Sequence, residues 1–485
     1  MNSTKHLLIL SAPTQETLDE ATDSLCLYLQ QAQPDLADVA YSLLQQPSQA
    51  FRRCVVVQDM ADAITVLHER PVSRVFNHHQ PPVSRQMFFL FPGIGDHYLQ
   101  MGRALYETAP VFQEVVDNCS ATLLPYLGAT IPDLLYPAQD EPMAAAAPQI
   151  DLRAMLGRGT QAAPSPTAAR LQETAVAHPV VFTIEYALAQ LLISWGIRPA
   201  AMMGYSLGEY VCACLAGVLS LQDALTLVAQ RAQLIQALPA GRMLAVSAEK
   251  TAVQPYLSAQ IALAAHNSIA NCVLAGEPEA IAQVQADLEA QDIVCRRLDT
   301  THAFHSHMLQ DLGDEMTQLA RECNHHSPQI PYISNVTGTW ITANEATDPA
   351  YWTYHMTQTV RCYEGLQTGL TSVHQHLFLE VGPGQSLGSF AKQHPACTRD
   401  QVGLILSSLP SAYDSKQADT FLLEMAGKLW LLDHAPNWAQ LHLKSQQMLT
   451  LPPPFHGAKS NPLPSASQRN ERGVRRRQRR QNRSH

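Results

Sequence analysis

Several protein classes are excluded by what this sequence lacks. Its ten cysteines form no C-x-x-C pair and are scattered along the chain, so we expect reduced thiols in a cytoplasmic protein and no disulfide scaffold. No apolar run reaches the length needed to span a bilayer, and the apolar start is too short for the core of a signal peptide. We therefore predict a cytoplasmic protein that has no membrane partner.

Charge is also scarce, and positive charge is concentrated at one end. Charged residues are 15% of the 485 and hydrophobic residues 46%, which gives ample material for a buried core. Residues 469–485 contain eight Arg and one Glu, so this segment carries +7 and the rest of the chain carries −10 − 7 = −17. The acidic body argues against a nucleic-acid partner. We predict a disordered basic tail at residues 459–485.

The hydrophobic pattern divides the chain into α/β units. Residues 1–85 alternate strand and helix patterns, and "FFLFPGIGDH" then opens a second unit with a buried strand that enters a glycine turn. Inside the second unit, which we place at 86–395, residues 243–300 have the order β-α-β-β-α-β of a ferredoxin-like subdomain. A weakly apolar segment, 396–458, follows before the tail.

The stretch "AAMMGYSLGEYVCACLAG" contains the most informative local motif. A short apolar run enters Gly204-Tyr205-Ser206-Leu207-Gly208, and an apolar helix pattern follows. This strand–turn–helix context is the one that a nucleophile elbow requires, because the glycines permit a strained turn that exposes the serine. The positive end of the following helix would face a developing oxyanion. We interpret Ser206 as a nucleophile; a plain tight turn is the alternative.

Three histidines lie close together in "THAFHSHM", at positions 302, 305 and 307. Their spacing matches no helical or finger-type metal pattern, and no acidic or Cys partner stands nearby. A metal site, a solvated loop and a general base are the three possible readings. Because an activated serine needs a base, we favour His305 in that role.

Arg231 stands out on a predicted helix that follows the capping box Ser220-x-x-Asp223. At about 100° per residue, Arg231 lies opposite the polar Gln222, on the apolar and inward stripe. A buried arginine cannot lose its charge and needs an anionic partner. That partner is either an internal carboxylate or a carboxylate of the substrate, which would imply an acyl donor with a free acid.

Together these motifs resemble the malonyl-CoA:acyl-carrier-protein acyltransferase family, in particular the acyltransferase domains of modular polyketide synthases. In order along the chain, the matching stretches are "FPGIGDHYLQMGRALYETAPVF", "HPVVFTIEYALAQLL", "MMGYSLGEY", Arg231, "HAFHSHM", "ISNVTG" and "LEVGPG". The fold implied is an α/β-hydrolase-like large subdomain with an inserted ferredoxin-like small subdomain, preceded by an α/β linker subdomain.

The resemblance implies a role for each matching residue. Ser206 would be the nucleophile, His305 its base, and the main-chain carbonyl of Asn335 would orient that base. The backbone N–H groups of Ile94 and Leu207 would form the oxyanion hole. Arg231, Phe304, His302 and His178 would contact the substrate. No metal or other cofactor is implied, since coenzyme A carries the donor and phosphopantetheine comes with the carrier protein.

The donor implied is malonyl. In this family H-A-F-H tends to accompany malonyl donors, because Phe304 narrows the pocket where an α-methyl group would lie, and Leu207 points the same way. Four positions depart from the family pattern: Ile94 and His97 replace glutamines, His178 stands where Gln is common, and Tyr205 replaces a frequent His. These departures put the donor range in doubt more than the reaction class.

The flanking segments also resemble this family. Residues 1–85 resemble the linker between ketosynthase and acyltransferase, and "GKLWLLDHAPNWAQLH" with "LPPPF" resembles the segment that packs back after the transferase. We expect an excised or free-standing transferase that serves an acyl carrier protein of another chain, and a polyketide synthase acting with it in trans is a further candidate partner. The alternatives are transfer of another acyl group, an acyl hydrolase that clears stalled carriers, and a non-catalytic docking subunit.

Overall fold

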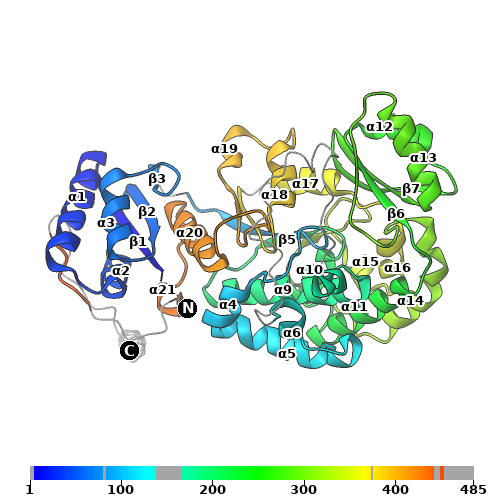
Figure 1. Cartoon of the computed structure of the whole chain (residues 1–485), viewed down its shortest axis with the longest axis horizontal. Coiled ribbons are helices and arrows are strands. Elements are labelled where there is room, and N and C mark those ends of the chain that lie inside the picture. Colours follow the sequence, from blue (N-terminus) through cyan, green and yellow to red (C-terminus); the bar gives the residue numbers. More distant parts are fainter. Residues whose placement is uncertain (1–4, 80–82, 138–164, 373–374, 442–447, 453–485) are drawn as a thin grey trace, which may run out of the picture.

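The computed structural model describes residues 5–79, 83–137, 165–372, 375–441 and 448–452. The predicted tail at 459–485 and most of the last part of 396–458 lie outside the described residues. Three sheets organise the described part of the chain, with three, five and four strands. They form the linker part, the large subdomain and the small subdomain of an α/β protein (Figure 1), which confirms the predicted fold class.

A parallel sheet in the order β10-β5-β4-β11-β12 forms the centre of the large subdomain. The strands are β4 (Gln86–Phe91), β5 (Ala201–Gly204), β10 (Tyr332–Ile333), β11 (His376–Glu380) and β12 (Ile405–Ser407). "MFFLF" and the "LFL" of β11 are apolar at successive positions because helices cover both faces of the sheet. Parallel pairing brings the carboxyl ends of these strands to one edge, where the loops after β4 and β5 meet.

Helices surround this sheet. They are α4 (Arg103–Thr108), α5 (Pro110–Leu127), α6 (Ile131–Leu135), α8 (Pro166–Leu171), α9 (Thr174–Ser194), α10 (Gly208–Leu215), α11 (Leu221–Gln236), η2 (His307–Leu312), α14 (Gly313–Arg321), α15 (Ala343–Thr347), α16 (Ala350–Thr357), α17 (Cys362–Leu370), α18 (Ser386–Gln393) and α19 (Arg399–Val402). By length and composition, helix α9 could cross a membrane. This contradicts the prediction that no apolar run is long enough to span a bilayer. However, 83% of its apolar window is buried inside the protein, as in the core helix of a globular domain.

The small subdomain has the predicted β-α-β-β-α-β order. Its elements are β6 (Arg242–Val246), α12 (Lys250–Val253) with η1 (Gln254–Tyr256), β7 (Ile261–Ser268), β8 (Asn271–Gly276), α13 (Pro278–Glu289) and β9 (Cys295–Arg297). The antiparallel sheet has the order β7-β8-β6-β9, so the first and last strands of the motif lie side by side. This pairing returns the chain to the large subdomain just before the histidine-rich stretch.

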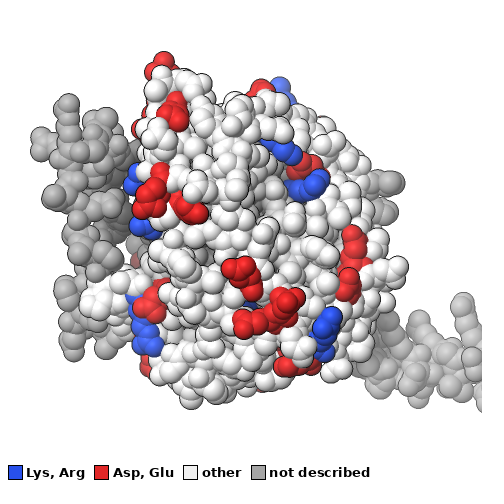
Figure 2. All heavy atoms as spheres, turned by 90° about the vertical axis from the view of Figure 1, so that its right-hand side faces the viewer, with Lys and Arg blue, Asp and Glu red and all other residues white. Residues whose placement is uncertain are grey.

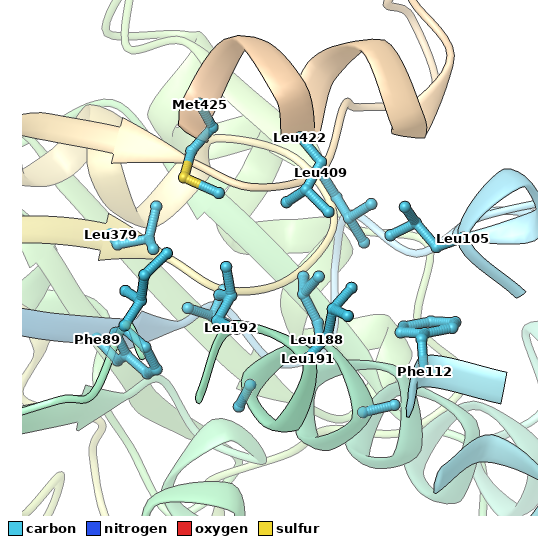
Figure 3. Packing of buried hydrophobic residues seen from close by; sticks show 14 of the residues in the cluster. Phe89, Leu105, Phe112, Leu188, Leu191, Leu192, Leu379, Leu409, Leu422 and Met425 are labelled. Carbon is cyan, nitrogen blue, oxygen red and sulfur yellow. The ribbon is translucent and has the colours of Figure 1, made fainter. Parts of the chain in front are cut away.

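The linker part is an antiparallel sheet covered by helices. It contains β1 (His6–Ala12), α1 (Gln15–Ala32), α2 (Leu36–Leu44), β2 (Phe51–Val57), α3 (Met60–Glu69) and β3 (Phe76–His79). Helix α20 (Ala418–Leu431), which precedes α21 (Trp438–Leu441), joins this part to the large subdomain. Gly427 of α20 packs closely against Leu7 and Cys54 of the linker sheet. On its other side, Leu422 and Met425 face Leu188, Leu192 and Leu379 of the large subdomain (Figure 3).

Acidic side chains predominate at the end of the molecule that carries the small subdomain (Figure 2). Residues 242–348 contain thirteen Asp and Glu but five Lys and Arg, a net charge of 5 − 13 = −8. A surface of this sign repels a phosphate backbone. The absence of a nucleic-acid partner stays a prediction.

Candidate active site

The turn that carries Ser206 is strained and has room for no additional side chains. Ser206 has φ +50°, in the left-handed region that non-glycine residues rarely adopt. A Cβ at Gly204 would lie 2.1 Å from the carbonyl carbon of Gly208, and a Cβ at Gly208 would lie 2.3 Å from the carbonyl oxygen of Phe91. Both motif glycines are therefore required by close backbone packing. The turn exposes Ser206 at the edge of the sheet where β4 and β5 end.

Ser206 and His305 are in direct contact. The Oγ of Ser206 lies 2.6 Å from Nε2 of His305, and Nδ1 of His305 lies 3.1 Å from the main-chain oxygen of Gln358. Because a carbonyl oxygen can only accept, Nδ1 carries the ring hydrogen and Nε2 presents a lone pair to the serine hydroxyl. This is the tautomer that a general base needs. His305 also has a positive φ, +56°, so both partners are held in an unusual backbone conformation.

The expected role of Asn335 in orienting the base is wrong. Its main-chain oxygen accepts from the amide of Arg361, and the carbonyl next to His305 belongs to Gln358. The side chain of Asn335 instead supports the elbow: Oδ1 accepts from the amide of Ser206 at 2.7 Å, and Nδ2 donates to the oxygen of Gly204 at 2.6 Å. The two bonds span the strained residue and hold its backbone in place.

The expected oxyanion hole lies where the loop after β4 meets the elbow. Gly93 has φ +66°, and a Cβ there would lie 2.4 Å from the oxygen of Tyr205, so the two loops touch through backbone. Within the described residues, the amides of Ile94 and Leu207 have no hydrogen-bond acceptor. Glu185 of α9 is fully buried and holds this loop by accepting from the amide of Gly93 at 2.6 Å. Two free amides at one place are the donors that an oxyanion requires.

The surroundings of His305 are electropositive. Burial and, after it, the charge of Arg231 lower the pKa of His305 to about 3, while the main-chain oxygens of Gln358 and His355 act in the opposite direction. His305 is therefore neutral near pH 7. It is also buried, which rules out the solvated loop. In the part of the chain that is described, no three His, Cys, Asp or Glu side chains come together as metal ligands.

Arg231 of α11 is buried without a carboxylate partner. It is only 1% exposed, and no Asp or Glu of the described chain forms an ion pair with it, so the internal salt bridge is not found. Its Nη1 donates to Nδ1 of His178 at 2.9 Å, its guanidinium lies over the ring of Tyr210 at 5.6 Å, and its Nε has no partner within the described residues. A buried cation with an unused donor is a site for an anion.

His178 and two neighbours complete this end of the site. Arginine can only donate, so Nδ1 of His178 accepts and the ring is neutral. Burial holds the pKa of His178 well below its ordinary value, and the nearby charge of Arg231 acts in the same direction. Phe304 lies beside His178, with ring centroids 5.3 Å apart. His97 is nearby, and its ring interacts with the main chain of Leu171 and the side chain of Gln172.

His302 contacts protein groups through its ring. Its Nδ1 lies 2.8 Å from Oγ1 of Thr301 and 3.2 Å from Oγ1 of Thr174, and its Nε2 lies 3.3 Å from the main-chain oxygen of Leu238. Both ring nitrogens therefore have partners within the protein, and contact between His302 and a substrate stays a prediction. His302 fastens the histidine-rich loop to α9 and to the end of α11.

Sequence reasoning missed three residues beneath the elbow. Gln358 acts through its main-chain oxygen, so its side chain gives no signal. Glu209 follows the motif serine by three positions and is fully buried, with Oε2 accepting from the amide of Asn335 at 2.7 Å and Oε1 bonded to the hydroxyl of Tyr351. His355 is 1% exposed and lies next to Glu209. A glutamate inside an apolar helix pattern was the one signal available, since a buried carboxylate needs donors.

Comparisons with known proteins give one consistent result. The acyl transferase domain family matches residues 88–394, and a family described as CurL-like, PKS C-terminal matches residues 6–67. A subunit of the phenolphthiocerol/phthiocerol polyketide synthase of Mycobacterium tuberculosis is 32% identical over 461 residues, which are 92% of this chain and 29% of that protein. The chain thus spans less than a third of this relative.

Solved structures agree over nearly the whole chain. The acyl transferase domain of ZmaA has a TM-score of 0.81 and 32% identity, and the match covers 93% of this chain and all of that one. The acyl transferase domain of SpnD, in complex with 2-(pent-4-yn-1-yl)malonyl, has a TM-score of 0.75 and 30% identity, with 89% and 96% covered. These matches confirm the resemblance that the motifs carry.

Proposed function

Because the chain belongs to the acyltransferase domains of polyketide synthases, we propose that it moves a malonyl unit from coenzyme A to an acyl carrier protein. The unit travels as an ester of Ser206 and ends on the phosphopantetheine thiol of the carrier. One observation carries the donor assignment: Arg231 is a buried cation without a carboxylate partner in the described chain, in the same cluster as the reacting pair.

In the first half-reaction, Ser206 becomes acylated. His305 Nε2 takes the proton of the Ser206 hydroxyl, 2.6 Å away, as the oxygen attacks the thioester carbonyl. The amides of Ile94 and Leu207 stabilise the resulting oxyanion, and the positive end of α10 adds to this stabilisation. The carbonyl of Gln358 supports the imidazolium through Nδ1. The intermediate then collapses, the C–S bond breaks, and His305 returns the proton to the sulfur of coenzyme A.

The second half-reaction reverses these roles. His305 removes the proton of the carrier's phosphopantetheine thiol, and the sulfur attacks the malonyl ester of Ser206. The C–O bond breaks, and the proton passes through His305 back to Ser206. The same oxyanion donors serve both halves, and we propose that neither a metal nor an organic cofactor takes part. This chain would act in trans on a synthase that lacks its own transferase domain.

The donor assignment rests on two side chains. Arg231 offers a guanidinium to the free carboxylate of the donor, and His178 fixes its orientation through the 2.9 Å bond to Nη1. Phe304, beside His178, restricts the space for a substituent on the central carbon. The SpnD domain, described in complex with a substituted malonyl group, supports a free carboxylate as the shared feature and leaves the substituent to residues such as Phe304.

Intact-protein mass spectrometry tests the proposal. We expect a malonyl adduct after mixing with malonyl-CoA, a weaker methylmalonyl adduct and little acetyl adduct, and none of these on a Ser206→Ala variant. An adduct with a different acyl group only would keep the transferase and overturn the donor assignment. If coenzyme A is released but no adduct passes to a carrier protein, the enzyme is a hydrolase. The absence of any adduct or coenzyme A release would favour a docking subunit.

A further inference from the structure

His355 lies at the centre of a buried cluster beneath the nucleophile. It belongs to the last turn of α16 and is 1% exposed. Its ring makes edge-to-face contacts with Tyr210 and Trp352, at centroid distances of 5.3 and 5.7 Å, and its centroid lies 6.0 Å from that of His305. Its Nε2 lies 3.4 Å from Oε2 of Glu209, the nearest carboxylate.

His355 lies between the segment that holds His305 and the segment that holds Ser206. On one side, α16 and the residue just after it hold the base, because the Gln358 oxygen accepts from Nδ1 of His305. On the other side, Glu209 accepts from the amide of Asn335, and the side chain of Asn335 accepts from the amide of Ser206. Glu209 belongs to α10, the helix that begins at the elbow. Two side chains of α16, Tyr351 and His355, thus reach the elbow through Glu209, and His355 is the one that also lies beside the ring of His305.

We propose that His355 is a positioning residue that fixes the helix holding the base relative to the turn holding the nucleophile, through its contact with Glu209. It touches neither the donor nor the reacting atoms. Its effect is to keep His305 Nε2 at hydrogen-bond distance from Ser206 Oγ while the reaction proceeds. This inference rests on the Ser206–His305 pair of the proposed function and is independent of the identity of the acyl donor.

The electrostatics of the contact agree with this role. Burial raises the pKa of Glu209 to about 8, and burial together with the charge of His305 and Arg231 holds the pKa of His355 well below its ordinary value. Near pH 7 both groups are therefore neutral, so the 3.4 Å contact between Oε2 and Nε2 joins two uncharged groups. A neutral pair avoids a second positive charge beside His305, which would oppose the protonation of the base during the reaction.

A purely space-filling histidine is the competing explanation, and two substitutions distinguish it from the proposal. His355→Phe keeps an aromatic ring against Tyr210 and Trp352 but removes the nitrogens. His355→Gln keeps a polar group within reach of Glu209 but removes the ring. His394→Leu is the control, because His394 is a buried histidine of the same domain that contacts Tyr363 and the amide of Ala396.

The readout is the rate at which a fluorophosphonate labels Ser206, measured on each folded variant. A displacement of about 1 Å costs roughly 100-fold in a positioned reaction. We expect His355→Phe to label about 30- to 100-fold more slowly, His355→Gln to stay within about 10-fold of the unaltered protein, and His394→Leu to label at the unaltered rate. With malonyl-CoA, kcat for acylation falls in the same order while KM stays unchanged.

Either of two results would overturn the proposal. One is a folded His355→Phe variant that labels as fast as the unaltered protein. The other, which decides the matter even if that variant fails to fold, is a folded His355→Gln variant that labels more than about 100-fold more slowly. Because the fluorophosphonate needs no acyl donor, a wrong malonyl assignment would change the coenzyme A experiments and leave these labelling rates as they are.

Discussion

The two ends of the active site differ in how completely their polar groups are paired. At the reacting end, the Ser206 hydroxyl, both ring nitrogens of His305 and the side chain of Asn335 all have partners within 3.1 Å. At the other end, Nε of Arg231 has no partner within the described residues. Both ends are buried to a similar degree, so exposure does not explain the difference.

The comparison indicates which end of the site has a polar group left for a ligand to pair. A folded chain rarely leaves buried donors unpaired, because each costs about 1–3 kcal/mol and more when it is charged. At the reacting end the side chains of Ser206, His305 and Asn335 are fully paired in the free protein, and only the backbone amides of Ile94 and Leu207 are left without an acceptor in the described chain. The unpaired end becomes complete only when an anion arrives, and a donor with a free carboxylate is such an anion. Catalysis and donor choice are thus assigned to separate side chains, which the following changes can test separately.

The largest effect is expected from breaking the complete end. His305→Ala removes the base, and a general base contributes about 100- to 10,000-fold to such reactions. We expect acylation by malonyl-CoA and by acetyl-CoA to fall by a similar factor, measured by rapid quench and mass spectrometry. A much larger loss for one donor than for the other would contradict the separation of the two ends.

The next largest effect is expected at the unpaired end. Arg231→Ala removes the charged donor, and hydrogen bonds to charged groups contribute about 1.5–3 kcal/mol each. We expect kcat/KM for malonyl-CoA to fall about 100-fold or more and that for acetyl-CoA to change little, in steady-state assays with both donors. Equal losses would show that Arg231 supports the fold and does not bind the carboxylate.

A smaller change is expected in the preference between malonyl and methylmalonyl donors. Phe304→Ala enlarges the space beside His178, and one methylene or methyl group is worth about 1–3 kcal/mol of discrimination. We expect the ratio of the two kcat/KM values to move about 10-fold toward methylmalonyl-CoA. An unchanged ratio in a folded variant would mean that Phe304 does not line the space for the substituent.

The pH dependence links the two ends. Burial and then the charge of Arg231 lower the pKa of His305 to about 3. Arg231→Gln removes that charge and raises this pKa, so labelling of Ser206 by a fluorophosphonate should begin to fall at a higher pH on acidification than in the unaltered protein. Above both pKa values His305 is neutral in each protein, and the protonation state no longer differs. A shift to lower pH would contradict the electrostatic coupling.

The last effect concerns the stability of the fold and not its activity, and it is expected at Glu209. Its pKa rises from 4.5 to about 8 on folding, so the folded state keeps a proton that the unfolded state loses between these values. The unaltered protein therefore loses stability from this group as pH rises across that window. Glu209→Gln, which stays neutral, should gain in melting temperature relative to the unaltered protein from about pH 5 to pH 8. A difference that is constant with pH would contradict a neutral Glu209.

The sequence predicted the parts of this site that depend on local patterns. Gly204 and Gly208 flank Ser206 because backbone packing forbids any side chain there, and that constraint is visible as a motif. Arg231 was found because a charge on an apolar helix stripe is conspicuous. The β-α-β-β-α-β order of the small subdomain also followed from alternation of short apolar runs, and its sheet order agrees.

The rest depends on contacts between distant segments. His305, the proposed base, is oriented by the main-chain oxygen of Gln358, and any residue type supplies such an oxygen. His302 resembled a ligand in sequence, but Leu238 and two threonines occupy its nitrogens. Glu209 and His355 are 146 positions apart and show their relation only once α10 and α16 pack together. Tertiary pairing of this kind leaves no local signal.

The most direct test of the division between the two ends is a crystal structure of the protein after reaction with malonyl-CoA in the absence of a carrier. The account predicts an ester on Ser206 whose free carboxylate lies against the guanidinium of Arg231, with Nε now paired and His305 still bonded to the oxygen of Gln358. An ester whose carboxylate points to solvent, with Arg231 still unpaired, would contradict it.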